Sequence, residues 1–395
     1  MKHKAPIYIC SAKRTPIGAF QGAFAEISAT ALGTKAVSAV LQDSSVPPEA
    51  IDEVIMGCVL TAGLGQAPAR QVALGAGLPS TVQAMTINKV CSSGLAAVML
   101  AARTIEIGAA SAIVAGGMEN MSRAPYLLPK LRSGGRLGHV DCIDSIIRDG
   151  LWDVYNNFHM GSAAELCART YNISRDAQDT YAAETYKRAL AAAAAGYYKE
   201  EIVPVAILER KRERIIDTDE EPARGNIERF PDLPPAFDPA GTVTVANASS
   251  LSDGAAAMLV CSEEFAAKHN CRPLARIVAQ GWAGHAPEWF TTAPVDAVNM
   301  VLETAGVSVG EIDLVELNEA FASVAIACSA QLGLETRQLN VSGGAVALGH
   351  PIGASGARIL TTLVHNLNRM RARLGIATIC NGGGEATALL VESLE

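Results

Sequence analysis

The chain has 395 residues, of which 49% are hydrophobic and 18% charged, and its formal net charge is −8. This length exceeds one ordinary domain, so we expect two or three units with large buried cores. The acidic balance argues against nucleic acid as the main partner, because no excess of positive charge is present to neutralise phosphates.

Short apolar runs alternate with alanine-rich helical stretches along the chain, which is typical of α/β architecture. Helices are predicted over 31–41, 94–107, 295–305 and 354–368. Buried strands are predicted over 51–60, 111–116, 314–317 and 377–380.

The chain also resembles itself. Three short segments recur in the same order about 260 residues later. The matching pairs are 51–54 with 312–315, 93–94 with 355–356, and 113–119 with 379–385. This order predicts a duplicated α/β unit.

The middle of the chain, residues 123–245, breaks this pattern. A long helix is predicted between Ser174, a residue type that caps helix N-termini, and Gly196, a residue type that ends helices. A charged segment at 211–224 and a proline-rich segment at 231–239 follow it. We expect this region to be an excursion from the first α/β unit that lies over a site.

Nine cysteines are scattered along the chain without a C-x-x-C pair. That pattern disfavours a disulfide framework or a zinc site and favours a reducing compartment, the cytoplasm. The first six residues show no signal-peptide core, and no apolar stretch is expected to span a membrane. No metal site is therefore expected.

Two cysteines and one histidine stand in glycine-rich segments: Cys91 in 88–94, His350 in 343–356 and Cys380 in 379–385. A thiol where a strand-like run turns into a helix can be held as a thiolate by the helix N-terminus and a nearby imidazole. Glycines such as Gly382 let backbone N–H groups approach an oxyanion. Together the three segments predict acyl transfer through a cysteine thioester, although each cysteine alone could be a buried structural thiol and the histidine a loop residue.

Asn318 follows a predicted strand and precedes a predicted helix. Its amide could hold a water or a carbonyl group, and a helix N-cap is the alternative. Glu119 and Glu385, each after a glycine run, are interpreted as structural.

Six segments make the chain resemble the thiolase family over nearly its whole length: 88–94, 116–122, 159–165, 318–321, 343–356 and 379–385. The resemblance implies an α/β fold of five αβαβα layers, built from two duplicated halves with an inserted loop domain. It places the N-terminal half at 1–122 plus 246–272, the loop domain at 123–245 and the C-terminal half at 273–395. It also implies a homodimer or homotetramer.

The resemblance assigns a role to each reactive residue. Cys91 is expected to take the acyl group, with His350 as the base that activates it. Cys380 is expected to remove a proton from the second acyl-CoA and to reprotonate CoA. One oxyanion hole would consist of His350 and of Asn318 acting through a water, and the other of the Cys91 and Gly382 N–H groups.

The acyl-CoA substrate supplies the reactive thioester, so no separate cofactor is implied. Ser249 would bond the pantetheine, and Arg224 is either a contact to the adenosine phosphates or a solvated surface charge. The expected channel lining is Leu151, His159, Met160 and Phe321.

The favoured function is the reversible condensation of two acetyl-CoA to acetoacetyl-CoA, because Met160 resembles short-chain members in which this residue crowds the acyl pocket. A degradative 3-ketoacyl-CoA thiolase with a wider pocket is the main alternative. A ketoacyl synthase is disfavoured by Cys380, and a non-catalytic carrier of the same fold is disfavoured by the complete reactive set.

Overall fold

The computed structural model describes residues 5–209 and 212–394. The two ends of the predicted halves, residues 1–4 and 395, and the first residue of the predicted charged segment lie outside this part. Within the described residues, no helix is long and apolar enough to cross a membrane.

The N-terminal half is built on strands in the order β4-β3-β5-β12-β1. Strand β5 runs parallel to β3 and antiparallel to β12, which in turn is antiparallel to β1. The strands are β1 (Ile7–Arg14), β3 (Glu53–Gly57), β4 (Gln83–Ile87), β5 (Ala112–Asn120) and β12 (Ser252–Ser262), with the short β2 (Gly18–Ala19) paired to β12.

The C-terminal half repeats the arrangement of β3, β5, β12 and β1 in the order β14-β15-β16-β13, and β13 pairs antiparallel with β1 to join the halves. Its strands are β13 (Ala275–Gly284), β14 (Leu314–Leu317), β15 (Leu374–Asn381) and β16 (Glu385–Ser393). The parallel pair β14 and β15 corresponds to β3 and β5. The recurring Ser93 and Ser355 are the first residues of equivalent helices. The predicted duplication is therefore confirmed.

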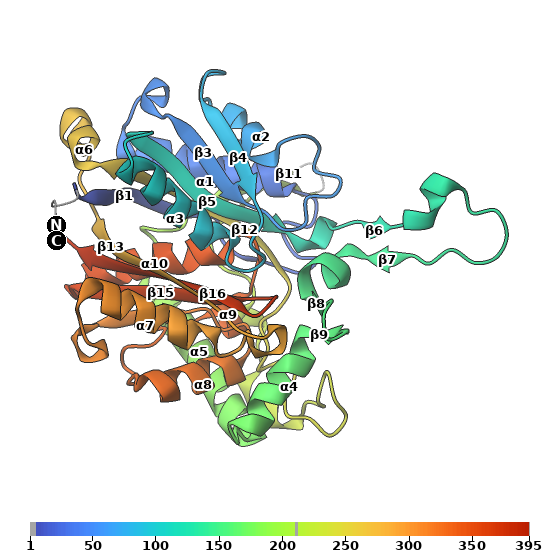
Figure 1. Cartoon of the computed structure of the whole chain (residues 1–395). Helices are drawn as coiled ribbons and strands as arrows, with labels where there is room; N and C mark the ends of the chain where they lie inside the picture. The colour runs from blue at the N-terminus through green and yellow to red at the C-terminus, as the bar shows by residue number, and fades with distance from the viewer. Residues whose placement is uncertain (1–4, 210–211, 395) are drawn as a thin grey trace.

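Helices separate and cover the two halves of this continuous sheet in five layers, as expected (Figure 1). Helices α3 (Ser93–Glu106) and α10 (Ser355–Met370) pack on each other between the two halves of the sheet. The outer layers are α1 (Ala29–Ser44) with α2 (Pro68–Gly75) on one side and α7 (Ala293–Ala305) with α8 (Ala322–Leu332) on the other. The remaining helices of these halves are α6 (Glu263–His269) and the four-residue α9 (Ala345–Leu348). The first ten residues of α10 are all buried, as a helix enclosed on every side requires.

The predicted helices correspond to α1, α3, α7 and α10, and the predicted strands to β3, β5, β14 and β15. The strand predicted at 51–60 is shorter than expected, because β3 ends at Gly57. Beyond it, the N–H groups of Val59 and Leu60 donate to the Glu119 carboxylate instead of to a neighbouring strand. Strand β5 is longer than expected and continues to Asn120.

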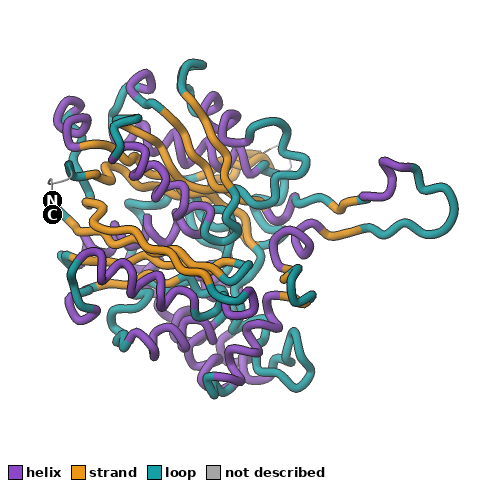
Figure 2. Tube along the Cα trace, in the orientation of Figure 1, coloured by secondary structure: helices purple, strands orange, loops and turns teal. Residues whose placement is uncertain are grey.

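The inserted middle region has two parts (Figure 2). An arm formed by β6 (Tyr126–Leu127), β7 (Ile143–Asp144) and the loop between them projects from the body. The rest contains β8 (Trp152–Asp153), β9 (Phe158–His159), α4 (Met160–Thr170), α5 (Arg175–Ala195) and the hairpin β10 (Val205–Glu209) with β11 (Arg212–Ile216). The helix ends predicted for α5 are confirmed, because Ser174 accepts a hydrogen bond from the Ala177 N–H and Gly196 adopts a left-handed conformation with φ 74°.

Candidate active site

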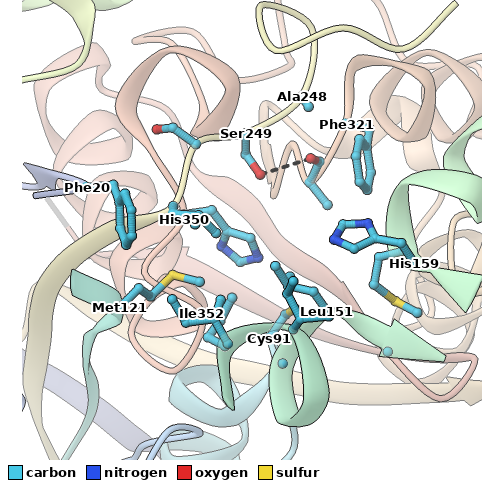
Figure 3. A pocket seen from close by; sticks show the side chains of 18 of the residues that line it. Phe20, Cys91, Met121, Leu151, His159, Ala248, Ser249, Phe321, His350 and Ile352 are labelled. Atoms are coloured by element: carbon cyan, nitrogen blue, oxygen red, sulfur yellow. Dashed lines mark hydrogen bonds between the residues drawn. The ribbon is translucent and has the colours of Figure 1, made fainter. Parts of the chain in front are cut away.

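A cavity of about 610 Å³ opens where the two halves and the inserted region meet (Figure 3). Of the residues predicted for the site, it is lined by Cys91, Leu151, His159, Met160, Ser249, Phe321, His350, Cys380 and Gly382. Segments that are far apart in the sequence therefore contribute to one enclosed space. The structure thus places both cysteines and the histidine where a single small substrate can reach them.

Cys91 lies on the turn that joins β4 to α3. The residue before it, Val90, has a positive φ of 47°, which a β-branched residue rarely adopts. Ser93 holds this turn, since its Oγ accepts from the Lys89 N–H at 2.8 Å and donates to the Val90 carbonyl at 2.6 Å. The strained turn presents the thiol to the cavity at the start of α3.

The Cys91 thiol is protonated in the free protein. Burial raises its pKa to about 12, and this effect exceeds the opposing hydrogen bonds from the backbone N–H groups of Gly382 and of Cys91 itself. In the free protein, burial thus outweighs the stabilisation of a Cys91 thiolate by the helix N-terminus. The two N–H groups nevertheless face the sulfur, as the predicted second oxyanion hole requires.

His350 is positioned as a proton acceptor. Its Nδ1 lies 2.6 Å from the Ser355 Oγ, and that hydroxyl also lies 3.0 Å from the Pro351 carbonyl oxygen. These contacts fit either tautomer of His350. In the tautomer with the proton on Nδ1, Ser355 donates to the Pro351 carbonyl and Nε2 is the acceptor, as a general base requires. Nε2 has no hydrogen-bond partner within the part of the chain that the structure describes.

The imidazole of His350 is neutral at ordinary pH. Its burial, together with the positive charge of Arg358, lowers its pKa to about 3. Arg358 lies on the first turn of α10 and forms a buried ion pair with Glu316 on β14, with 3.8 Å between Nη1 and Oε2. A neutral imidazole beside a neutral thiol can act as a general base when a substrate arrives.

Asn318 lies directly after β14 and is buried, with 1% of its surface exposed. Its backbone N–H donates to the Thr378 carbonyl, while neither atom of its side-chain amide has a hydrogen-bond partner among residues 5–209 and 212–394. The alternative role as a helix N-cap is wrong, because α8 begins at Ala322 and its N-cap position is Phe321. An unsatisfied buried amide is consistent with a group that receives a water or a substrate oxygen.

Cys380 is the penultimate residue of β15 and is buried. Burial, reinforced by the nearby Cys91, raises the pKa of its thiol well above the usual range. Gly382 follows within the turn to β16, where Gly383 and Gly384 adopt positive φ values of 93° and 87°. Such a turn requires glycine at these two positions.

The substrate channel has apolar walls with a few polar groups. Ser249 donates its hydroxyl to the Ala320 carbonyl at 2.9 Å, which leaves its oxygen free to accept (Figure 3). His159 stacks on Phe237 with ring centroids 4.9 Å apart. Its Nδ1 accepts from the Gly161 N–H, so Nε2 is the nitrogen that can donate.

Met160 lies close to the reactive centre. Its sulfur would be 3.5 Å from a Cβ placed on Gly382. Phe321, which directly precedes α8, also lines the channel. Its ring makes an edge contact with the Phe237 ring, with 6.1 Å between the ring centroids. These side chains narrow the channel beside the residues expected to hold the acyl group.

Arg224 does not line the cavity. Its side chain is 57% exposed and pairs with Glu221 at 3.6 Å. Its proposed contact with CoA phosphates stays a prediction. No group of three or more metal-ligating side chains is found in the described ranges 5–209 and 212–394.

The sequence analysis missed residues that support the reactive groups. Ser355 orients His350 through the contact between its hydroxyl and Nδ1. A hydroxyl five residues after the histidine in the same glycine-rich segment could have predicted this role. Glu119, by contrast, was interpreted as structural, and it accepts from the Gly353 N–H and so holds the loop that carries His350. Further lining residues that were not predicted include Phe20, Met121, Ile146, Phe237, Phe290 and Ile352.

Both halves of the chain are similar to known protein families. A family model for the thiolase N-terminal domain matches residues 7–264, and one for the thiolase C-terminal domain matches residues 271–393. A probable acetyl-CoA acetyltransferase of Escherichia coli (strain K12) is 49% identical over 387 residues, covering 98% of each chain. The acetyl-CoA acetyltransferase of Cupriavidus necator is 51% identical over 388 residues, covering 98% of this chain and 99% of the relative. Acetyl-CoA acetyltransferase 2 of Arabidopsis thaliana is 46% identical over 391 residues, covering 98% and 97%.

Proposed function

The chain belongs to the thiolase family, and from this premise we propose that it is an acetyl-CoA acetyltransferase, which converts two acetyl-CoA reversibly into acetoacetyl-CoA and CoA. The observation that carries this proposal is the cavity in which a thiol at a helix start, a neutral imidazole and a second thiol meet. The names of the relatives favour this reading over a degradative thiolase of broader chain length.

The first half-reaction transfers an acetyl group to Cys91. As the sulfur attacks the thioester carbonyl, the Nε2 atom of His350 takes the thiol proton. The oxyanion that forms lies against the N–H groups of Cys91 and Gly382, which already face the sulfur. When the tetrahedral intermediate collapses, CoA leaves as a thiolate and takes a proton from Cys380, so Cys380 becomes the base for the next step.

The second half-reaction forms the carbon–carbon bond. The Cys380 thiolate removes a proton from the methyl group of a second acetyl-CoA, and a thiol with a strongly raised pKa is a strong base once deprotonated. The enolate oxygen is held by the protonated His350 and, through a water, by Asn318. The enolate carbon attacks the acetyl group, and Cys91 departs and regains its proton from His350.

The substrate contacts are part of the same proposal. Ser249 accepts from a pantetheine amide, and His159 donates from Nε2, while Leu151 and Phe321 enclose the chain. Arg224 is offered as a contact to the adenosine phosphates. The thioester supplies the chemistry, so we propose no separate cofactor.

We also propose that the protein works in the cytoplasm, in lipid metabolism, as a homodimer or homotetramer. The reducing compartment is supported by the nine cysteines, all of which are free thiols, including the exposed Cys142. Assembly is supported by the projecting arm, which carries exposed leucines.

Thiolysis of 3-ketoacyl-CoA substrates of increasing chain length tests the function. Met160 and Phe321 should discriminate against each added methylene by roughly 1–3 kcal/mol where the wall does not yield. Met160 is flexible, so the preference should be steep but not absolute. A monotonic decline of kcat/KM from acetoacetyl-CoA supports the short-chain function. Equal or higher efficiency at eight carbons or more would favour the degradative alternative.

A further inference from the structure

The residues that directly follow the two reactive cysteines are bonded to each other. Ser92 donates its hydroxyl to Oδ1 of Asn381 at 2.7 Å, although the two residues are 289 positions apart in the sequence. Both are buried, with 0% and 2% of their surface exposed. One residue belongs to each half of the molecule, so this hydrogen bond joins the two loops that carry the chemistry.

Ser92 also contacts the other neighbour of Cys380. Its Oγ lies 3.3 Å from the Ile379 carbonyl, so one hydroxyl reaches the residues on both sides of the second cysteine. Because a hydroxyl has a single proton, the shorter contact to Asn381 takes it. A shift of Ser92 would therefore move Cys91, its chain neighbour, relative to Cys380.

The amide of Asn381 continues the connection to Gly382. Its Nδ2 donates to the Gly382 carbonyl at 2.9 Å and lies 3.4 Å from Oε2 of Glu385. The reverse orientation of the amide would set its oxygen against two acceptors, so the hydrogen bonds fix which atom faces which partner. Gly382 is thus held at its carbonyl while its N–H faces the Cys91 sulfur.

An ion pair continues the connection toward solvent. Lys89 Nζ contacts the Glu385 Oε2 atom that Asn381 approaches, and the two side chains are 31% and 45% exposed. Exposed ion pairs contribute little to stability on their own. The buried hydrogen bond between Ser92 and Asn381 is therefore the stronger of the two contacts that connect the loops. Lys89 lies two residues before Cys91 and Ser92 directly after it, so the connected side chains flank the first cysteine.

We propose that Ser92 and Asn381 are a pair of positioning residues that sets the spacing between the Cys91 loop and the Cys380 loop, and with it the oxyanion hole formed by the Cys91 and Gly382 N–H groups. This inference rests on the proposed function. Neither residue exchanges a proton with substrate. Misplacing groups by about 1 Å can cost about 100-fold in rate, so a bond that fixes them affects turnover more than binding.

The test uses Ser92→Ala, Asn381→Leu and the double variant of the full chain, with thiolysis of acetoacetyl-CoA and thermal unfolding as readouts. Each single variant should lower kcat about 10- to 100-fold and change KM less than about threefold. The double variant should be no worse than the more impaired single variant, because both changes break one connection.

Ser342→Ala is the matched control. Its hydroxyl makes a similar buried hydrogen bond to Oδ1 of Asn366, at 2.9 Å. It should lower the melting temperature comparably while leaving kcat within about twofold. Ser92→Ala removes one oxygen atom, so it carries the test even if Asn381→Leu fails to fold.

Three outcomes separate the two proposals. A wild-type protein that does not cleave acetoacetyl-CoA would refute the proposed function. An active wild type whose Ser92→Ala variant keeps its kcat, or loses no more than the control, would refute only the positioning role. If the losses in kcat of the two single variants multiply in the double variant, that role is also overturned. Multiplied losses would mean that Ser92 and Asn381 act independently rather than through one hydrogen bond.

Discussion

The protonation of Cys91 and His350 follows from where each side chain lies. Burial disfavours the charged form of both groups, so the pKa of the thiol is raised to about 12 and that of the imidazole is lowered to about 3. The pair therefore begins as a neutral thiol and a neutral base. Charge appears only when the thioester arrives and provides an oxyanion that the Cys91 and Gly382 N–H groups can bind.

At the residue scale, Cys380→Ala should separate the two half-reactions. The variant keeps Cys91 and His350, so single-turnover transfer of label from acetyl-CoA to the protein should survive. Steady-state condensation should fall by roughly two to four decades, the scale of lost acid–base catalysis. Cys91→Ser is the companion variant and should take up no label. Equal losses in both half-reactions would contradict the assigned division of labour.

His350 should contribute to stability in a pH-dependent way. The unfolded chain binds the proton near pH 6.5, whereas the pKa in the folded protein is about 3. The stability that the neutral His350 contributes is therefore complete above about pH 6.5 and is lost as the pH falls toward 3. Relative to His350→Asn, the wild type should lose roughly 3 kcal/mol between pH 7 and 4.5, measured by urea unfolding. A difference that does not change with pH would refute this.

At the scale of elements, Glu119 connects three segments of the chain. Its carboxylate, at the end of β5, accepts from the N–H groups of Val59, Leu60 and Gly353 at 3.0, 3.1 and 2.9 Å. Burial raises its pKa to about 7 despite these bonds. The interpretation of Glu119 as structural agrees with these contacts, which hold the loop after β3 and the loop that carries His350.

Glu119→Gln should destabilise the protein by about 1–3 kcal/mol. Both carboxylate oxygens accept from backbone N–H groups, so an NH₂ group in either place leaves at least one N–H without its acceptor. Urea unfolding at pH 8 measures the change. Glu49→Gln on the surface is the control and should leave the free energy of unfolding within about 0.5 kcal/mol. A loss no larger than in the control would show that the carboxylate does not hold these segments.

The elements themselves could largely be predicted from the sequence, because local patterns determine them. Ser174 and Gly196 marked both ends of α5, and the recurring segments marked equivalent strands. What could not be predicted depends on contacts between distant segments. The shortened β3 depends on Glu119, and the bond between Ser92 and Asn381 depends on how the halves meet. The arm, which has no core of its own, carries no periodic pattern that would predict its direction.

At the scale of the whole molecule, each half contributes one of the two cysteines, at positions that are not equivalent in the duplication. The turn before α3 supplies Cys91 from the N-terminal half, and the end of β15 supplies Cys380 from the C-terminal half. The inserted region then closes the channel with side chains such as Met160. Because each half contributes one thiol, the distance between the Cys91 and Cys380 thiols depends on how the two halves pack against each other.

The arm between β6 and β7 offers an apolar surface away from the body (Figure 1). Leu131 and Leu137 are 52% and 102% exposed, and a segment held by one short ladder cannot bury them itself. In the proposed assembly, we expect these leucines to contact another chain. Leu131→Asp combined with Leu137→Asp should therefore lower the mass of the assembly in light scattering, with Cys91 acetylation retained. Ile107→Asp, at the exposed end of α3, is the control and should leave the mass unchanged. An assembly whose mass survives the arm substitutions does not depend on the arm.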